Sequence, residues 1–148
     1  MRVRSLLIAA ASLMMLAAFV VADDKEIKLE GIKCLLKPDS PAKASVSADY
    51  KGGKVFFCCA GCCAKFDAEK NAVAANRQLV ATKQYKQVKC PLSGSACNAE
   101  QKVSIDGVDV CFCCAGCKSK VEKAEGAARA ELVFNNKVFE KAYEPAKK

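Results

Sequence analysis

Phe57-Cys58-Cys59-Ala60-Gly61-Cys62 occurs a second time in this chain, unchanged, as Phe112-Cys113-Cys114-Ala115-Gly116-Cys117. Each copy follows a lone cysteine, which is Cys34 in the first repeat and Cys90 in the second. Thiols that recur at a fixed spacing hold a soft metal ion, cross-link the chain, or exchange disulfides. The repeat therefore indicates a duplicated module, and its function becomes a choice among these three chemistries.

Each repeat predicts a β-hairpin that runs into its cysteine cluster. Hydrophobic and polar residues alternate over 46–57 on either side of Gly52-Gly53, and over 103–112 on either side of Asp106-Gly107. Asp-Gly between alternating hydrophobic residues is one of the strongest hairpin signals. We therefore expect Gly52-Gly53 and Asp106-Gly107 to be the two turns.

Helical spacing follows each cluster, which makes the expected fold a small α+β one. After Cys59, cysteines and Phe66 recur at i+3, i+4 and i+7, and this spacing predicts one helix or two short ones over about 60–81. The second helix is shorter and ends near Gly126. Residues 130–134 predict a strand, followed by a turn and a terminal helical segment that serves packing.

The chain divides into six segments by these signals. They are a signal peptide at 1–22, a lead-in at 23–33, a first cysteine-rich metal-binding repeat at 34–81, a linker at 82–89, a second such repeat at 90–126, and a C-terminal strand and helix tail at 127–148.

The first segment predicts export. Arg2 and Arg4 form a basic start, the run over 6–21 carries no charge, and small residues up to Ala22 precede the acidic pair Asp23-Asp24. This order is typical of a cleaved signal peptide. An uncleaved anchor is the alternative, because the run is about as long as the shortest spans of a bilayer. We expect cleavage near Ala22 and a periplasmic or secreted protein without stable membrane insertion.

Charge and composition exclude several functions. The chain carries a formal charge of +8 and contains no tryptophan and no histidine. Its lysines are scattered rather than clustered with aromatic residues, which favours a solvated surface over nucleic-acid binding. Without histidine, mixed Cys/His zinc sites and Ser/His or Cys/His catalytic pairs are excluded. We expect no nucleic-acid partner, and no particular protein partner is indicated.

The 11 cysteines decide the remaining chemistry. Each repeat is too small to bury a self-sufficient core, so thiols must supply folding energy. Export favours disulfides because that compartment is oxidising, yet an odd count leaves one thiol over. Eight cysteines match between the repeats, and the unmatched ones are Cys63, Cys97 and Cys111.

Helix geometry brings the first and last thiols of each cluster together. Side chains at i and i+4 share a face, and a hairpin can return the lone cysteine to the same point. A helix N-terminus also favours the thiolate form. The six predicted metal ligands are Cys34, Cys58, Cys62, Cys90, Cys113 and Cys117.

A tetrahedral zinc site needs a fourth ligand. The candidates are Cys59 and Cys114, Cys97 in the second repeat only, and a solvent or partner ligand. A trigonal Cu(I) site would need none. Thiolate-only sites suit zinc, Cu(I) and iron–sulfur chemistry, and we expect Zn²⁺, with Cu(I) as the alternative.

These motifs resemble a known family. Cys90-Pro91-Leu92-Ser93-Gly94, a hairpin and the segment 112–120 are similar to the YHS and TRASH domains, small treble-clef-like modules associated with heavy-metal binding, sensing and trafficking. A lone cysteine followed by Cys-x3-Cys is the family's pattern, and it covers about 34–70 and 90–124. The resemblance implies two treble-clef-like hairpin-and-helix modules in tandem, with the same six cysteines as ligands. Two such modules behind an export signal also resemble exported bacterial proteins of unknown function.

Three functions follow, in order of preference. The first is metal binding, in which an ion closes each repeat and supplies its folding energy, or is sequestered. The second is a disulfide-stapled structural or interaction protein. The third is a thiol–disulfide oxidoreductase that uses Cys59–Cys62 and Cys114–Cys117 as C-x-x-C motifs. The βαβ context of such enzymes is missing, so we expect no enzyme.

Overall fold

Short strands and short helices alternate along residues 27–146, the part of the chain that the computed structural model describes. The elements are β1 (Lys43–Tyr50), β2 (Gly53–Phe57), α1 (Ala60–Ala64), α2 (Ala72–Ala81), β3 (Tyr85–Gln87), β4 (Asn98–Ile105), β5 (Val108–Phe112), α3 (Ala115–Glu122), α4 (Gly126–Phe134), α5 (Asn136–Ala142) and β6 (Tyr143–Pro145). This confirms a small α+β fold. The predicted signal peptide lies outside the described residues. Within them, no helix combines the length and hydrophobicity that crossing a membrane requires.

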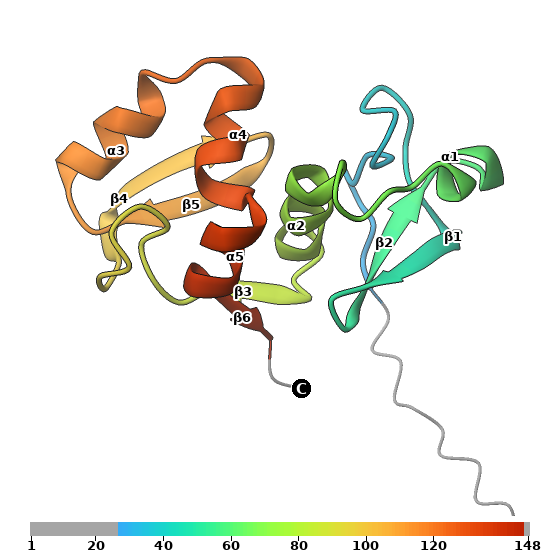
Figure 1. The fold of residues 1–148 in the computed structure, drawn as a ribbon, viewed down its shortest axis with the longest axis horizontal. Helices are drawn as coiled ribbons and strands as arrows, with labels where there is room; N and C mark the ends of the chain where they lie inside the picture. The colour runs from blue at the N-terminus through green and yellow to red at the C-terminus, as the bar shows by residue number, and fades with distance from the viewer. Residues whose placement is uncertain (1–26, 147–148) are drawn as a thin grey trace, which may run out of the picture.

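Two antiparallel hairpins carry the duplicated sequence (Figure 1). β1 pairs with β2 from Tyr50 opposite Gly53, and β4 pairs with β5 from Ile105 opposite Val108. Both turn residues of each hairpin have positive φ, which suits the right-handed twist of the strands. The first turn is Lys51-Gly52 rather than the predicted Gly52-Gly53, because Gly53 already pairs within the ladder.

Helices lie between the two hairpins. In Figure 1, β1, β2 and α1 occupy one end of the molecule, β4, β5 and α3 occupy the other, and α2 stands between them with α4 and α5. The predicted helix over 60–81 is two helices, α1 and α2, which was one of the two expected forms. The helix of the second repeat, α3, ends at Glu122, shortly before Gly126 as expected.

The strand predicted over 130–134 is wrong, because these residues belong to the helix α4. A short apolar run cannot be assigned to helix or strand from its composition alone. Ala130, Val133 and Phe134 are the buried residues, and their i, i+3, i+4 spacing places them on one helical face. Burial of that face against the rest of the core decides the conformation.

A third small sheet links the middle of the chain to its end. β3, within the predicted linker at 82–89, pairs antiparallel with β6, with Tyr85 opposite Pro145 and Gln87 opposite Tyr143. Tyr85 and Tyr143 both pack on Phe139 of α5, with ring centroids 4.9 Å apart in each case. The predicted linker and tail are therefore parts of one core.

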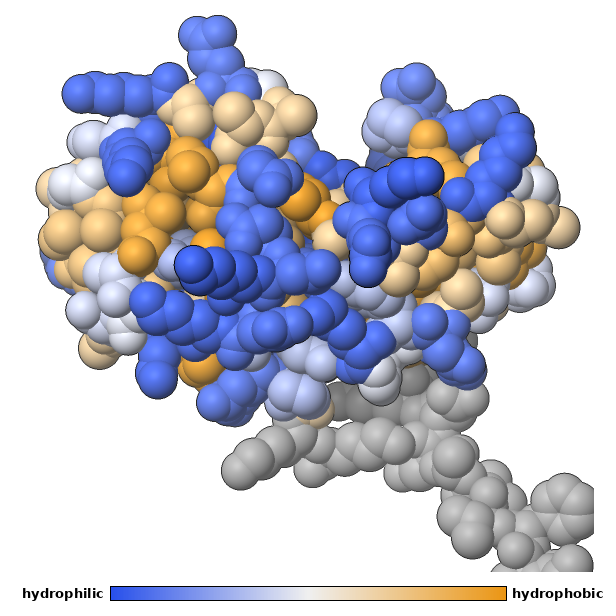
Figure 2. Space-filling view, viewed as in Figure 1, coloured by the Kyte–Doolittle hydropathy of each residue, from blue (hydrophilic) through white to orange (hydrophobic). Residues whose placement is uncertain are grey.

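Polar contacts join the first repeat to the second repeat and to the C-terminal segment across that core. The buried amide of Asn76 in α2 donates to the carbonyl of Phe134 at 2.8 Å and accepts from the hydroxyl of Tyr50 at 3.2 Å. Arg77 forms an ion pair with Asp106, which lies in the turn of the second hairpin as predicted. Most of the surface in Figure 2 between the two hairpins is hydrophilic, and the most hydrophobic side chains on that face gather over the half with β4, β5 and α3.

Three glutamine side chains complete the open edges of the hairpins. A two-stranded sheet leaves backbone groups unpaired along its edges. Each of these amides accepts from the N–H and donates to the C=O of a single strand residue, as a neighbouring strand would. The pairs are Gln78 with Phe56 (2.6 and 3.0 Å), Gln84 with Lys54 (2.7 and 2.7 Å), and Gln87 with Cys111 (2.8 and 2.6 Å). Both hairpins are thereby held at the strand that ends in the cysteine cluster.

Candidate metal centre

The six predicted ligands lie in two groups of three. The first triad consists of Cys34, Cys58 and Cys62, and the second consists of Cys90, Cys113 and Cys117. Within each triad the three Sγ atoms all lie within 4.8 Å of one another. Such a group can hold one metal ion, and each ligand comes from a separate part of the repeat.

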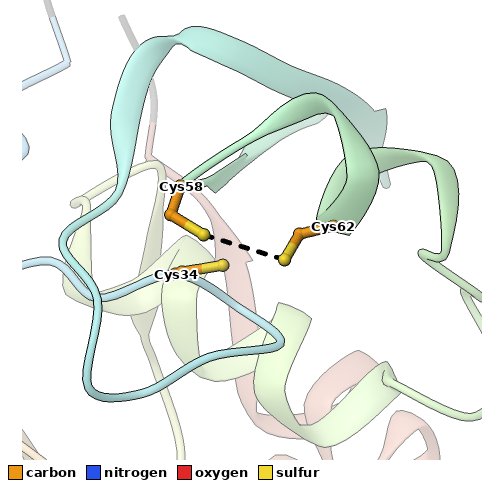
Figure 3. A group of neighbouring side chains, drawn as sticks. All are labelled: Cys34, Cys58 and Cys62. Atoms are coloured by element: carbon orange, nitrogen blue, oxygen red, sulfur yellow. Dashed lines mark hydrogen bonds between the residues drawn. The ribbon is translucent and has the colours of Figure 1, made fainter.

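The strand-to-helix junction positions two thiols of the first triad. Cys58 directly follows β2, Cys62 lies in α1, and extended Cys59 is the N-cap between them (φ −157°, ψ 161°). This places the Sγ atoms of Cys58 and Cys62 at 3.7 Å. A loop before β1 supplies Cys34, whose sulfur points toward the other two (Figure 3). The neighbouring Leu35 N–H donates to a β2 carbonyl at 3.3 Å, which holds the loop on the strand.

The second triad repeats this geometry. The Sγ atoms of Cys113 and Cys117 are also 3.7 Å apart, and Cys114 is the extended N-cap between them. Cys90 begins a tight turn in which its carbonyl accepts from the N–H of Gly94 at 2.8 Å. Gly94 has φ +76°, a left-handed conformation that glycine adopts without strain. The hydroxyl of Ser93 lies 3.2 Å from the Cys113 sulfur.

One backbone hydrogen bond explains the unequal spacing of the two repeats. The cysteine clusters follow the lone cysteine after 23 residues in the first repeat and 22 in the second. The N–H of Cys34 donates to Ser40 and that of Cys90 to Ser95, both at 2.8 Å. Ser40 lies six residues after its cysteine and Ser95 five, so the additional residue belongs to the turn. The two triads are therefore equivalent although the first turn has no proline directly after its cysteine and no glycine.

Backbone N–H groups favour ionisation of the lone cysteine in each triad. Burial opposes it, but hydrogen bonds from the N–H groups of Cys58 and Leu36 outweigh burial and lower the pKa of Cys34. In the second triad burial again opposes ionisation, and the hydroxyl and N–H of Ser93 bring the pKa of Cys90 down to about 6. Each lone cysteine thus sits among donors that suit a thiolate.

The last cysteine of each triad behaves in the opposite way. Burial, followed by the hydrogen bonds that its thiol donates to Cys58 and Cys59, raises the pKa of Cys62 to about 12. Burial, followed by the hydrogen bond between its thiol and that of Cys113, raises the pKa of Cys117 to about 12. Several thiolates this close cannot ionise together without a cation, because like charges oppose each other. A bound metal ion would supply that cation and displace the protons.

Cys59 and Cys114 lie beside the triads rather than within them. Both are exposed, and their sulfurs are 3.8 Å from Cys58 and 3.7 Å from Cys113 respectively. The N–H of Cys62, followed by its thiol, lowers the pKa of Cys59 to about 7. The N–H of Cys117 likewise lowers the pKa of Cys114. Each is a thiolate candidate one residue from a triad.

Cys97, the other predicted fourth ligand, is exposed and also outside the second triad. Its thiol contacts the carbonyl of Cys111 at 3.6 Å. Burial of the sulfur, followed by the charge and hydrogen bonding of Cys111, raises the pKa of Cys97 to about 11. The structure therefore places this thiol nearest to another unmatched cysteine.

Two lysines line an open pocket beside the first triad. An open pocket of about 320 Å³ there is lined by Cys59, Cys62, Lys37 and Lys65, among others. Three thiolates around a divalent ion carry one net negative charge, which nearby ammonium groups offset. Sequence reasoning missed these two lysines, and it also missed the contact of Gln87 with Cys111, because a lysine or glutamine near a cysteine cluster is not by itself a signal of a site.

All 11 cysteines lie within the described residues, and their thiols are free. Comparison of the chain with protein-family models, with characterised proteins and with solved structures finds no significant match. The resemblance to the YHS and TRASH domains therefore stays a prediction from the cysteine spacing. The class of protein that the fold and the site define is a cysteine-rich α+β protein with two thiol triads that could each hold a metal ion.

Proposed function

We propose that each triad binds one soft metal ion through three thiolates, with Zn²⁺ as the preferred ion and Cu(I) as the alternative. One observation carries the proposal: equivalent cysteines of two repeats converge to within 4.8 Å at both places. The turns that carry Cys34 and Cys90 differ in sequence and in length, yet both bring their cysteine to the other two. The ligands are the six cysteines of the triads.

Sulfur spacing fits one metal ion in each triad. With Zn–S bonds of about 2.3 Å, two ligands of a tetrahedron lie about 3.8 Å apart, whereas a trigonal site with the same bonds separates them by about 4.0 Å. The Cys58–Cys62 and Cys113–Cys117 distances are both 3.7 Å. Both distances suit thiolates that share one Zn²⁺, and tetrahedral zinc calls for a fourth ligand in each site.

The fourth position faces solvent. Cys59 and Cys114 are exposed and adjacent to triad sulfurs, so either of them or a water molecule can complete the tetrahedron. An ion with one exchangeable ligand on the surface can pass to another thiol protein. The sites thus suit sequestration or handover of a metal as well as a structural role.

Metal binding also serves folding. Each triad ties a loop, the end of a strand and the start of a helix together, and none of these has a large core of its own. Binding free energy at such a site is folding free energy. We assign the protein to the YHS and TRASH type of treble-clef-like module and place it outside the cytoplasm, on the strength of the cysteine spacing and the predicted signal peptide.

Metal titration tests the proposal. The full chain, reduced and freed of metal, is titrated with Cd²⁺ while thiolate-to-metal charge transfer is followed in the ultraviolet. We expect two ions per chain, and one ion in Cys62→Ser and in Cys117→Ser. Cys63→Ser is the matched control, because Cys63 neighbours Cys62 but lies outside the triad, with its thiol 3.6 Å from the Ser47 carbonyl. Two ions in both triad variants would reject the assignment.

A second candidate is thiol–disulfide exchange at Cys59 and Cys62. Cys59 is exposed with a pKa of about 7, and Cys62 is buried with a pKa of about 12. An accessible thiolate three residues before a buried thiol is the arrangement that attacks a substrate disulfide and then resolves the mixed disulfide. The metal-free protein would reduce insulin with a dithiol as electron donor. If the Cys59→Ser variant reduced insulin at the wild-type rate, this candidate function would be rejected.

A further inference from the structure

Two of the three unmatched cysteines lie together at the open end of the second hairpin. The Cys111 sulfur is 2.8 Å from the carbonyl oxygen of Asn98, and the Cys97 sulfur is 3.6 Å from the carbonyl oxygen of Cys111. Each thiol therefore lies against the backbone of the segment that carries the other. Neither belongs to a triad.

A bulge in β4 creates this proximity. Lys102 pairs with Cys111 and Asn98 pairs with Phe112, so residues 99–101 of β4 have no partner on β5. Asn98 holds the bulge through its side chain, which accepts from the N–H of Glu100 at 3.0 Å. Asn98, at the start of the bulged strand, lies against the Cys111 sulfur, and Cys97 directly precedes it.

The position of Cys111 is fixed from the other side. The Gln87 side chain accepts from its N–H at 2.8 Å and donates to its carbonyl at 2.6 Å. Cys97 is exposed and Cys111 is half-buried, so a small oxidant can reach the pair. In the first repeat the equivalent residues are Ala42 and Phe56, and Phe56 is held in the same way by Gln78. Both thiols are thus particular to the second repeat.

We infer that Cys97 and Cys111 are a disulfide-forming pair, separate from the metal triads, that closes when the chain meets a low-molecular-weight disulfide such as oxidised glutathione. One thiol attacks the oxidant and releases one glutathione, which leaves a mixed disulfide. The second thiol displaces the other glutathione and forms the Cys97–Cys111 bond. Two cysteine thiols are oxidised, one glutathione disulfide is reduced, and the two protons pass to the released thiols.

This pairing resolves the odd cysteine count. Six thiols belong to the triads, Cys59 and Cys114 flank them, and the Cys97–Cys111 pair leaves Cys63 as the remaining thiol. The bond staples the bulged start of β4 to β5, two residues before Cys113. It therefore braces the second hairpin where no equivalent staple exists in the first.

Peptide mapping tests the inference on the full chain. The zinc-treated protein is incubated with oxidised glutathione, alkylated with N-ethylmaleimide, and digested with trypsin and chymotrypsin. Cleavage after Leu92, Lys102 and Phe112 separates each thiol of the pair from the triad cysteines. We expect fragment 93–102 joined to fragment 103–112, with two hydrogen atoms fewer than the separate fragments. Cys63→Ser should give the same joined fragments, and Cys97→Ser should give no joined fragments, with Cys111 either alkylated or carrying one glutathione.

Two results would overturn the inference. One is full alkylation of Cys97 and Cys111, or their attachment to triad cysteines, after the oxidant has reacted. The other is loss of the second metal ion in Cys97→Ser, which would identify Cys97 as a metal ligand. Joined fragments from a protein that takes up no metal would support the disulfide and reject the metal sites, so the two proposals fail separately.

Discussion

Tyr143→Phe should stabilise the protein, although it deletes a polar group. Tyr143 is only 3% exposed, and among the described residues its hydroxyl is the buried side-chain oxygen without a hydrogen-bond partner. A buried, unpaired hydroxyl costs about 1–3 kcal/mol. Phenylalanine keeps the ring stacked on Phe139 and removes that cost.

Tyr85→Phe provides a control with the opposite sign. Tyr85 packs on the same Phe139 ring, but its hydroxyl donates to the Lys51 carbonyl at 2.6 Å. Losing that bond should lower the free energy of unfolding by about 0.5–1.5 kcal/mol. One chemical change at two neighbouring tyrosines is thus expected to raise stability at one and lower it at the other.

Thermal unfolding of the zinc-loaded chain, followed by circular dichroism, measures both effects. For a domain of this size, Tm changes by roughly 4 °C per kcal/mol, so Tyr143→Phe should gain roughly 4–12 °C. An unchanged or lower Tm in Tyr143→Phe would refute the reasoning, because it would mean that the hydroxyl has a partner in solution. The same would follow if Tyr85→Phe were the more stable variant.

Alkaline pH gives a second readout on Tyr143. Burial, followed by the charges of Cys97 and Cys90, raises the pKa of its hydroxyl above the ordinary value of 10. The folded state then keeps the proton while the unfolded state loses it. Below about pH 10, the free energy of unfolding of the wild type is unaffected by the ionisation of this group. Because the unfolded state binds fewer protons above that pH, the free energy of unfolding falls as pH rises from about 10 toward the folded-state pKa, by at most about 1.4 kcal/mol per pH unit. The stability difference between Tyr143→Phe and the wild type should therefore widen above pH 10.

Two further predictions concern the metal centres. Removal of metal with a strong chelator should lower Tm and loosen both hairpins, because the ion supplies folding energy. Added Zn²⁺ should restore the circular dichroism spectrum. A chelator-treated protein with an unchanged Tm would contradict this prediction. Gln87→Leu removes the side chain that hydrogen-bonds to the N–H and C=O of Cys111. The free energy of unfolding should fall by about 1–3 kcal/mol, and the second site should lose its ion at a lower chelator concentration. Gln84→Leu is the matched control, because Gln84 holds Lys54 rather than a residue beside a triad; equal ion loss in both variants would show that Gln87 does not position the second site.

Local signals predicted the hairpins and the helices that follow them. Alternating side chains around Asp106-Gly107 and i+3, i+4 spacing after Cys59 depend on neighbours in the chain, which a sequence displays directly. The first turn was misplaced by one residue because Lys51 adopts φ +48°, a conformation more typical of glycine or asparagine. The helix at 130–134 depended on burial, which its short apolar run did not reveal.

Contacts between distant segments account for what sequence reasoning missed. β3 and β6 are three residues each and lie far apart in the chain, so neither carries a pattern long enough to predict their pairing. The triads were predictable because duplication marked their members. The donors around Cys90 and the contact of Gln87 with Cys111 were not, since a hydrogen bond to backbone requires no particular residue at the other end.

The pairing of β3 with β6 sets an order of assembly. Each cysteine-bearing hairpin needs only nearby residues, so it can form as soon as its own segment has left the ribosome. The strand at Tyr85–Gln87 must wait for Tyr143–Pro145, which follow both hairpins in the chain. The nascent chain therefore carries both thiol-rich hairpins before Tyr143–Pro145 can pair with β3 and close the core around Phe139.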